Sequence, residues 1–159
     1  MNPIIQTHFT ADPTVLVYGD TAWLYTGHDE PPDGVDDYVM KDWLCFSSRD
    51  LQSWQEHPLR LKATDFKWAS GDAYASRVIE RNNKFYWYVA VSHASIPGKA
   101  IGVAISDHPA GPFTDAIGRA LISGDMVPST GNEKANLDPT VITDTTARHI
   151  LCGAIKTVL

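Results

Sequence analysis

A short motif recurs in this chain at a fixed interval. The segment Asp12–Val15 reads Asp-Pro-Thr-Val, and Asp138–Val141 repeats it residue for residue. Midway between them lies Ala75–Val78, so that equivalent valines recur every 63 residues. A fixed period of this length indicates a repeat architecture, in which each repeat is a unit that needs its neighbours to bury its core.

Each repeat reads as a group of short strands. Runs of β-branched and aromatic residues alternate with turn pairs in the same register, Gly19-Asp20 and Asn82-Asn83. Helical periodicity is scarce. The sequence predicts the strands Thr14–Tyr18, Ala22–Thr26, Trp43–Ser47, Ser76–Arg81, Phe85–Val91 and Ile101–Ser106. A fourth, edge strand is expected near Trp54 in repeat one and near Phe113 in repeat two, and four antiparallel strands match a β-propeller blade.

The predicted fold is therefore all-β, with about two blades and the start of a third. Blade one is expected over about residues 10–60, blade two over about 70–120 and the third from residue 136. Propellers close a ring of about 4–8 blades, and closure protects the strand edges. We therefore expect residues 1–159 to be the N-terminal portion of one larger domain, with open blade edges that allow self-association.

Composition excludes several classes of function. The formal net charge of −6 argues against nucleic-acid binding, which needs clustered Lys and Arg. No apolar run approaches the ~18 residues that span a bilayer, and no signal peptide is visible, so a cytoplasmic location is expected. The two cysteines, Cys45 and Cys152, have no metal-type spacing, and neither a disulfide nor a metal or other cofactor is predicted.

Asp12 and Asp138 are the candidate catalytic residues. Both open the first strand of a repeat, and the innermost strand of a blade lines the central channel, so the two carboxylates are expected to converge. Inverting glycoside hydrolysis needs such carboxylates, a base that activates water and an acid that protonates the leaving oxygen, about 6.5–9.5 Å apart. Asp-Pro at a strand start is also a common turn element, so the residues alone leave both interpretations open.

The chain resembles glycoside hydrolase family 43, five-bladed propeller enzymes that act on arabinans and xylans. The resemblance covers nearly all of residues 2–142, in the stretches Thr10–Pro13, Tyr25–Glu30, Met40–Trp43, Val78–Asn82, Lys84–Val89, Ile101–Asp107 and Asn136–Val141. It implies an inverting glycosidase with Asp12 as general base and Asp138 as the carboxylate that orients the acid and tunes its pKa. The family's general acid is a Glu on a later blade, and no residue here matches it. The family's calcium-linked histidine also lies beyond this chain.

Three further residues are candidate substrate contacts. Tyr74 stands where the family often has the Trp of a Trp-Ala-Pro run, and it can stack on a sugar ring or simply pack between blades. His28 and Asp29 follow the second predicted strand and either border the substrate pocket or belong to a solvated acidic loop. Trp87 and Phe85, in contrast, are expected in the core because they lie in the middle of a strand.

Three functions follow from these features. The first is a glycosidase cleaving O-glycosidic bonds of arabinan- or xylan-type saccharides, with little or no turnover by a chain that lacks the acid. The second is a non-catalytic propeller remnant that binds carbohydrate. The third is a structural module that assembles blades from several chains.

The tail after Val141 departs from the family, which continues with a Trp-Gly-Asn strand. From about residue 143, a one-base shift of the codons permits a Gly, a Tyr and then Trp-Gly-Asn in the expected order. We therefore expect the encoding DNA, read from the codon of Asn136 onward, to restore that run in a shifted frame. An intact frame that ends at Leu159 would instead make the tail a genuine strand of the third blade.

Overall fold

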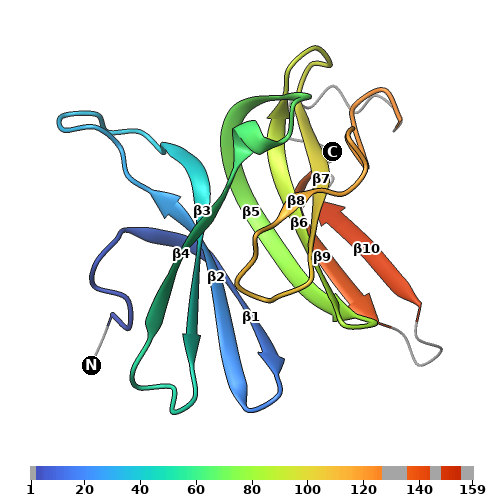
Figure 1. Ribbon diagram of the computed structural model, residues 1–159. Helices are drawn as coiled ribbons and strands as arrows, with labels where there is room; N and C mark the ends of the chain where they lie inside the picture. Colours follow the sequence, from blue (N-terminus) through green and yellow to red (C-terminus); the bar gives the residue numbers. More distant parts are fainter. Residues whose placement is uncertain (1–2, 127–135, 144–147, 155–159) are drawn as a thin grey trace.

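The computed structural model describes residues 3–126, 136–143 and 148–154, and the strands of these residues form three antiparallel sheets (Figure 1). The first sheet contains β1 (Thr10–Tyr18), β2 (Thr21–Asp29), β3 (Met40–Ser48) and β4 (Gln55–Lys62). After a 3-10 turn (Ala63–Asp65), the second contains β5 (Ala69–Arg81), β6 (Lys84–His93), β7 (Lys99–Ser106) and β8 (Thr114–Asp115). The third pairs β9 (Leu137–Thr143) with β10 (His149–Ala154).

The strands of each four-stranded sheet follow one another in chain order, which is the meander of a propeller blade. Successive sheets meet along their first strands, because β1 contacts β5 and β5 contacts β9. The three first strands, β1, β5 and β9, line a hollow of about 400 Å³. The guanidinium of Arg77 donates to Thr14 Oγ1 at 2.9 Å, a contact between positions one repeat apart. The prediction of two blades and the start of a third is confirmed.

Tight hairpins connect the first two strands of the first and second blades. Asn82 and Asn83 both have positive φ, 54° and 57°. This is the geometry of a type I′ turn, whose twist matches that of the two strands that it joins. Asn reaches positive φ more readily than most residues do. The turn pair read from the sequence therefore sets the register of β5 and β6.

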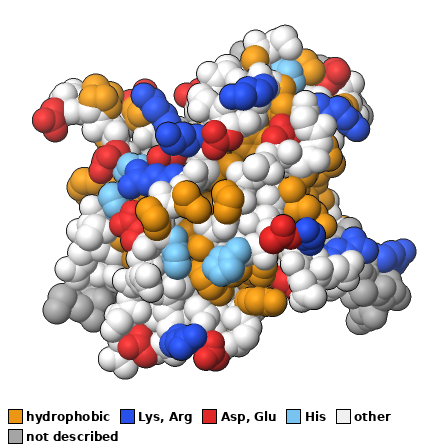
Figure 2. All heavy atoms as spheres, in the orientation of Figure 1, with side chains coloured by type: hydrophobic (Ala, Val, Ile, Leu, Met, Phe, Trp, Pro, Cys, Tyr) orange, Lys and Arg blue, Asp and Glu red, His pale blue; other side chains and the backbone are white. Residues whose placement is uncertain are grey.

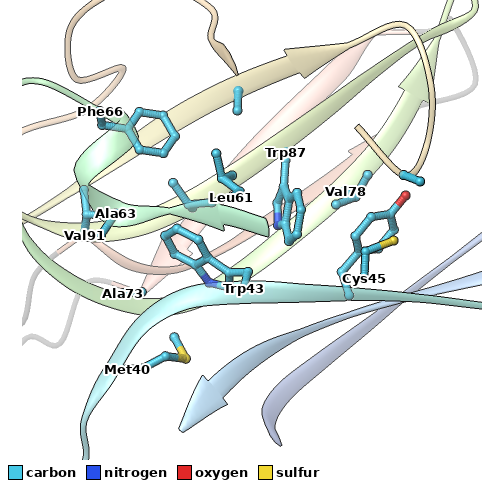
Figure 3. Close-up of a cluster of buried hydrophobic side chains, with 14 of the residues drawn as sticks. Met40, Trp43, Cys45, Leu61, Ala63, Phe66, Ala73, Val78, Trp87 and Val91 are labelled. Atoms are coloured by element: carbon cyan, nitrogen blue, oxygen red, sulfur yellow. The ribbon is translucent and has the colours of Figure 1, made fainter. Parts of the chain in front are cut away.

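The main core lies between the first two sheets. Trp43 and Trp87 are almost fully buried there, with ring centroids 6.3 Å apart, and Figure 3 shows both side chains in the space between the sheets. The hydroxyl of Tyr25, in the first sheet, donates to the Pro109 carbonyl, which follows the second sheet's β7, at 2.8 Å. Phe85 and Trp87 are each 1% exposed, so both belong to the core as predicted.

Part of the acidic stretch that follows the second predicted strand belongs to strands in the structure. His28 and Asp29 are the last residues of β2, and Asp42 lies within β3. The strand continues because Thr10 pairs with His28 and because the Asp29 amide donates to the Phe9 carbonyl at 3.2 Å. The placement of His28 and Asp29 in a loop is therefore corrected. The acidic residues Glu30, Asp33, Asp36 and Asp37 are exposed, as expected.

Residues 144–147 and 155–159 of the tail lie outside the described residues. Between them, β10 pairs with β9 in antiparallel register, with Leu151 opposite Val141. The shifted reading frame stays a prediction. Across the described residues, no helix is long and apolar enough to cross a membrane.

Truncation of Trp87 tests the importance of the core between the sheets. We expect Trp87→Ala to lower the free energy of unfolding by about 3–5 kcal/mol, since it leaves a large cavity and removes the partner of the Ser76 hydroxyl. Urea denaturation followed by circular dichroism measures the change. Phe9→Ala is the matched control, because the Phe9 side chain is 75% exposed. An equal loss in both variants would show that the sheets do not depend on this packing.

Candidate functional site

Asp12 and Asp138 occupy equivalent irregularities in β1 and β9. In β1 the pairing with β2 skips from Ala11 to Thr14, and in β9 the pairing with β10 skips from Leu137 to Thr140. Each aspartate therefore lies in a β-bulge, with φ of 49° and 51° respectively. Bulges re-aim side chains and are frequent beside active sites. The repeat thus gives both carboxylates the same unusual backbone.

The second blade has a bulge at the same place in its first strand, without the carboxylate and without the positive φ. The pairing of β5 with β6 skips from Ala73 to Ser76, which leaves Tyr74 and Ala75 in the irregular segment. The Tyr74 carbonyl accepts a hydrogen bond of 2.7 Å from the Trp43 indole, so this bulge is fixed to the core. Each of the three blades therefore has a bulge at this place in its first strand. The equivalent position is an aspartate in two blades and Ala75, directly after Tyr74, in the other.

The two aspartates are close enough to interact electrostatically. Partial burial raises the pKa of Asp12 above its usual value, and the negative charges of Asp138 and then Asp29 raise that pKa further. By side-chain accessibility Asp29 is half-buried, whereas Asp12 and Asp138 keep an exposed face. The convergence expected from the sequence for Asp12 and Asp138 is therefore present, and Asp29 joins them.

Asp29 is positioned by two backbone contacts. Its amide donates to the Phe9 carbonyl, and its Oδ1 accepts the Val39 amide at 3.1 Å. The second contact connects the end of β2 to the loop that precedes β3. This contact holds the end of the acidic loop beside the carboxylates, and Tyr38, the residue before Val39, lies there as a result.

Two aromatic residues accompany the carboxylates. The rings of Tyr38 and Tyr74 are stacked, with centroids 6.3 Å apart and an interplanar angle of 24°. Burial raises the pKa of Tyr38, as do the charges of Asp12 and Asp29. The Lys99 ammonium donates to the Tyr74 hydroxyl and, at 2.9 Å, to Ser92 Oγ. Tyr74 is therefore held from two sides beside the acidic cluster.

Tyr38 and Lys99 were not identified from the sequence. Tyr38 lies in an irregular loop without a counterpart in the repeat register, and Lys99 begins a strand, where a basic residue is unremarkable. Their contacts depend on how the loop returns to the cluster and on how the blades pack, and neither leaves a motif. Tyr74 is the residue of this group that the sequence did single out, and the structure places it in the bulge of β5.

His28 does not join this cluster. Its side chain lies on the other face of β2, where Nδ1 is 2.7 Å from Asp42 Oδ1. Neighbouring residues of a strand point to opposite faces, and Asp29 takes the face of the carboxylates. The role of His28 as a substrate contact therefore stays a prediction, and one that no contact with Asp12 or Asp138 supports.

The cluster contains groups that general base catalysis can use. It offers a carboxylate with a raised pKa, further carboxylates that perturb it, and aromatic rings beside them. A second hollow, of about 630 Å³, lies at the opposite end of the first blade between Trp23, Trp54 and His57. No residue of the carboxylate cluster lines it.

Comparison with known proteins identifies the family. The sequence profile described as Glycosyl hydrolases family 43 matches residues 1–157. The chain belongs to this family. The resemblance read from the sequence is thereby confirmed, and the propeller interpretation of the sheets agrees with it.

Several characterised relatives are similar to this family 43 chain. Xylosidase/arabinosidase 43A from Humicola insolens is 34% identical over 122 residues, which cover 72% of the chain and 37% of that relative. Arabinoxylan arabinofuranohydrolase from Bacillus subtilis is 27% identical over 162 residues, covering 90% of the chain and 30% of the relative. The chain thus spans about a third of the length of these relatives.

Solved structures of the family agree. A β-xylosidase/α-arabinofuranosidase from a compost microbial metagenome, in complex with xylotriose, superposes with a TM-score of 0.74 at 26% identity, covering 95% of this chain and 44% of that one. An α-L-arabinofuranosidase from Clostridium thermocellum gives 0.70 at 32% identity, covering 94% and 48%. The arrangement of the sheets is therefore that of the family's propeller.

The raised pKa of Asp12 predicts a pH-dependent effect on stability. The folded protein holds the Asp12 proton more tightly than the unfolded chain, so ionisation of Asp12 opposes folding as the pH rises through the interval above the usual aspartate pKa of about 3.9. We expect Asp12→Asn to have a higher urea midpoint than the wild type at pH 7. The difference should shrink as the pH falls toward 4.

Asp33→Asn is the control for this measurement, because it removes one negative charge from an exposed loop position. Asn also tolerates the positive φ of position 12, so the substitution does not strain the bulge. A midpoint for Asp12→Asn equal to or below that of the wild type at pH 7 would contradict the electrostatic account.

Proposed function

We propose that this chain supplies the general base and the modulating carboxylate of an inverting glycosidase. The observation that carries the proposal is the pair of equivalent bulges at Asp12 and Asp138, close enough that the charge of Asp138 raises the pKa of Asp12. Family membership supports glycoside hydrolysis as the class of reaction.

In the proposed reaction Asp12 removes a proton from water as the water oxygen attacks the anomeric carbon. The bond from that carbon to the leaving oxygen breaks, and a separate carboxylic acid protonates the leaving oxygen. A base with a pKa raised toward the working pH is more effective than an ordinary aspartate, provided that it remains ionised. Asp138 acts electrostatically, on Asp12 and on the acid.

The general acid is proposed to lie outside these 159 residues. The resemblance places it on a later blade of the propeller, and no residue of this chain matches it. We therefore propose that the chain alone shows little or no turnover. The complete active site would need the acid to be brought opposite Asp12 by further blades.

The substrate is proposed to be an arabinan- or xylan-type saccharide. The relatives' names include xylosidase, arabinosidase and arabinoxylan arabinofuranohydrolase, and one solved relative holds xylotriose. Tyr74 offers an aromatic face for a sugar ring, and Asp29 offers a carboxylate that can accept sugar hydroxyls. Tyr38, stacked on Tyr74, is proposed as part of the same platform.

The second candidate is a carbohydrate-binding protein without catalysis. The stacked rings of Tyr38 and Tyr74 beside the carboxylates favour it, since carboxylates and aromatic rings suffice to hold a sugar. The two candidates differ in whether Asp12 acts on water or merely accepts hydrogen bonds. Activity and binding measured on the same samples distinguish them.

The purified full chain is expected to release no more than background amounts of product from aryl arabinofuranosides and aryl xylosides. Turnover at a rate typical of an enzyme would contradict the need for an external acid. Any turnover that is found should fall by about 10²–10⁴-fold in Asp12→Asn if Asp12 is the base. The released sugar should then carry the inverted anomeric configuration by NMR.

Xylotriose binding by calorimetry completes the test. Tyr74→Ala should weaken binding by about 3- to 10-fold, as expected for the loss of one aromatic contact. Tyr86→Ala is a matched control on β6, away from the bulge. Binding that is unchanged in both Asp12→Asn and Asp138→Asn, without turnover, would favour the binding protein over the glycosidase.

A further inference from the structure

A second cluster of titratable side chains lies on the face of β2 turned away from the carboxylates. His8, His28 and Glu30 each offer one potential ligand atom, and these atoms all lie within 4.8 Å of one another. His28 Nε2 is 3.0 Å from one Glu30 oxygen, and His8 Nδ1 is 4.0 Å from the other. Histidine, acidic and basic side chains appear together on this part of the surface in Figure 2.

The two ring nitrogens that face Glu30 have no hydrogen-bond partner. Both His8 Nδ1 and His28 Nε2 are buried, and neither makes a hydrogen bond within the described part of the chain. The 3.0 Å approach of His28 Nε2 to Glu30 lacks the alignment of a hydrogen bond. Buried polar atoms are rarely left unpaired, so this arrangement calls for a ligand.

The opposite nitrogens of the same rings are held by carboxylates. His8 Nε2 is 3.1 Å from Glu56, and His28 Nδ1 is 2.7 Å from Asp42. Arg60 lies between these two acids. Its Nη1 is 3.5 Å from Asp42 Oδ2, and its Nη2 is 3.5 Å from Glu56 Oε1. A carboxylate on one ring nitrogen fixes the tautomer that leaves the other nitrogen's lone pair free, which is how metal-ligating histidines are oriented.

We propose that His8, His28 and Glu30 bind a divalent transition-metal ion, with Zn²⁺ the best match. Two imidazoles and one carboxylate suit zinc, whereas Ca²⁺ and Mg²⁺ prefer sets made of oxygen alone. Zinc bonds of about 2.0–2.1 Å place tetrahedral ligand atoms roughly 3.3 Å apart. The distances of 3.0 Å from His28 Nε2 and 4.0 Å from His8 Nδ1, each to a different oxygen of Glu30, lie on either side of that spacing. The exposed side chain of Glu30 can turn one oxygen toward both rings.

The charges around the cluster favour a cation. Glu30, Asp42 and Glu56 supply three carboxylates, against Arg60 and the ammonium of Lys41, which lines the adjoining hollow of about 220 Å³. With neutral histidines the carboxylates are in excess, so a divalent ion is accommodated. The exposed side of Glu30 leaves room for water as the fourth ligand.

The ion would attach the N-terminal segment to the end of β2. His8 precedes Phe9, whose carbonyl already accepts the amide of Asp29, and Asp29 belongs to the carboxylate cluster on the other face. A metal at His8 and His28 would fix the same strand end from the other side. Its role is structural, and it stabilises the strand start that leads into Asp12.

The test is titration of the chelator-stripped full chain with ZnCl₂, by calorimetry and by thermal unfolding. We expect one ion per chain and a rise in the thermal midpoint. Glu30→Gln should weaken binding at least 10-fold, and His28→Gln should abolish it. Asp42→Asn, which removes the carboxylate behind His28 and its ion pair with Arg60, should weaken binding by about 10–100-fold. Co²⁺ in place of Zn²⁺ should give the visible absorption bands of a tetrahedral site.

Two variants serve as matched controls. His57→Gln removes a histidine that contacts Ser47 instead, and Cys152→Ser removes an exposed thiol that can bind zinc elsewhere. Both should bind Zn²⁺ like the wild type. Because Glu30 is exposed, Glu30→Gln should unfold like the wild type in chelator. No binding by the wild type, or equal binding by Glu30→Gln and the wild type, overturns the proposal.

Discussion

Trp43 and Trp87 fill the space between the first two sheets, and the position of Tyr74 relative to Asp12 depends on that packing. The two indoles are almost fully buried and belong to one cluster with residues from both blades. The Trp43 indole also donates to the carbonyl of Tyr74, so the core and the bulge of the second blade are joined by one hydrogen bond. A shift of one sheet against the other would therefore move Tyr74 relative to the carboxylates. The angle between the blades and the geometry of the cluster are set by the same contact.

The β-bulges at Asp12 and Asp138 determine where the two carboxylates point. A regular strand would alternate its side chains between the two faces of the blade, and a carboxylate at the strand start would follow that alternation. The extra residue at Asp12 and at Asp138 breaks the alternation at the same place in two blades. Burial and mutual repulsion then raise the pKa of Asp12. Backbone irregularity, repeated at a fixed interval, thus produces electrostatic coupling between residues far apart in the sequence.

Much of this arrangement is predictable from the sequence, because the repeat carries information over long distances. The period locates the blades, the turn pairs locate the hairpins, and equivalent positions around one axis bring Asp12 and Asp138 together. The rest depends on contacts that the period does not describe. Tyr38 arrives through a loop with no counterpart in the next blade. His28 lies in a strand because pairing with β1 continues past the predicted end, and its neighbour His8 belongs to a segment that precedes the repeat. Clusters that form across strands in this way cannot be predicted from the sequence pattern, because they depend on the three-dimensional structure.

The positive φ of Asp12 and Asp138 has a consequence for how such a repeat can diverge. Aspartate and asparagine reach this region of backbone space at modest cost, whereas alanine is disfavoured there. Ala75, at the equivalent position of the second blade, does not have a positive φ. In these three blades the carboxylate and the positive φ that aims it occur together or not at all. Restoring an aspartate at position 75 would add a third acid to the ring without giving it the direction of the other two, so the number of catalytic groups in such a repeat is limited by backbone conformation as much as by side-chain identity.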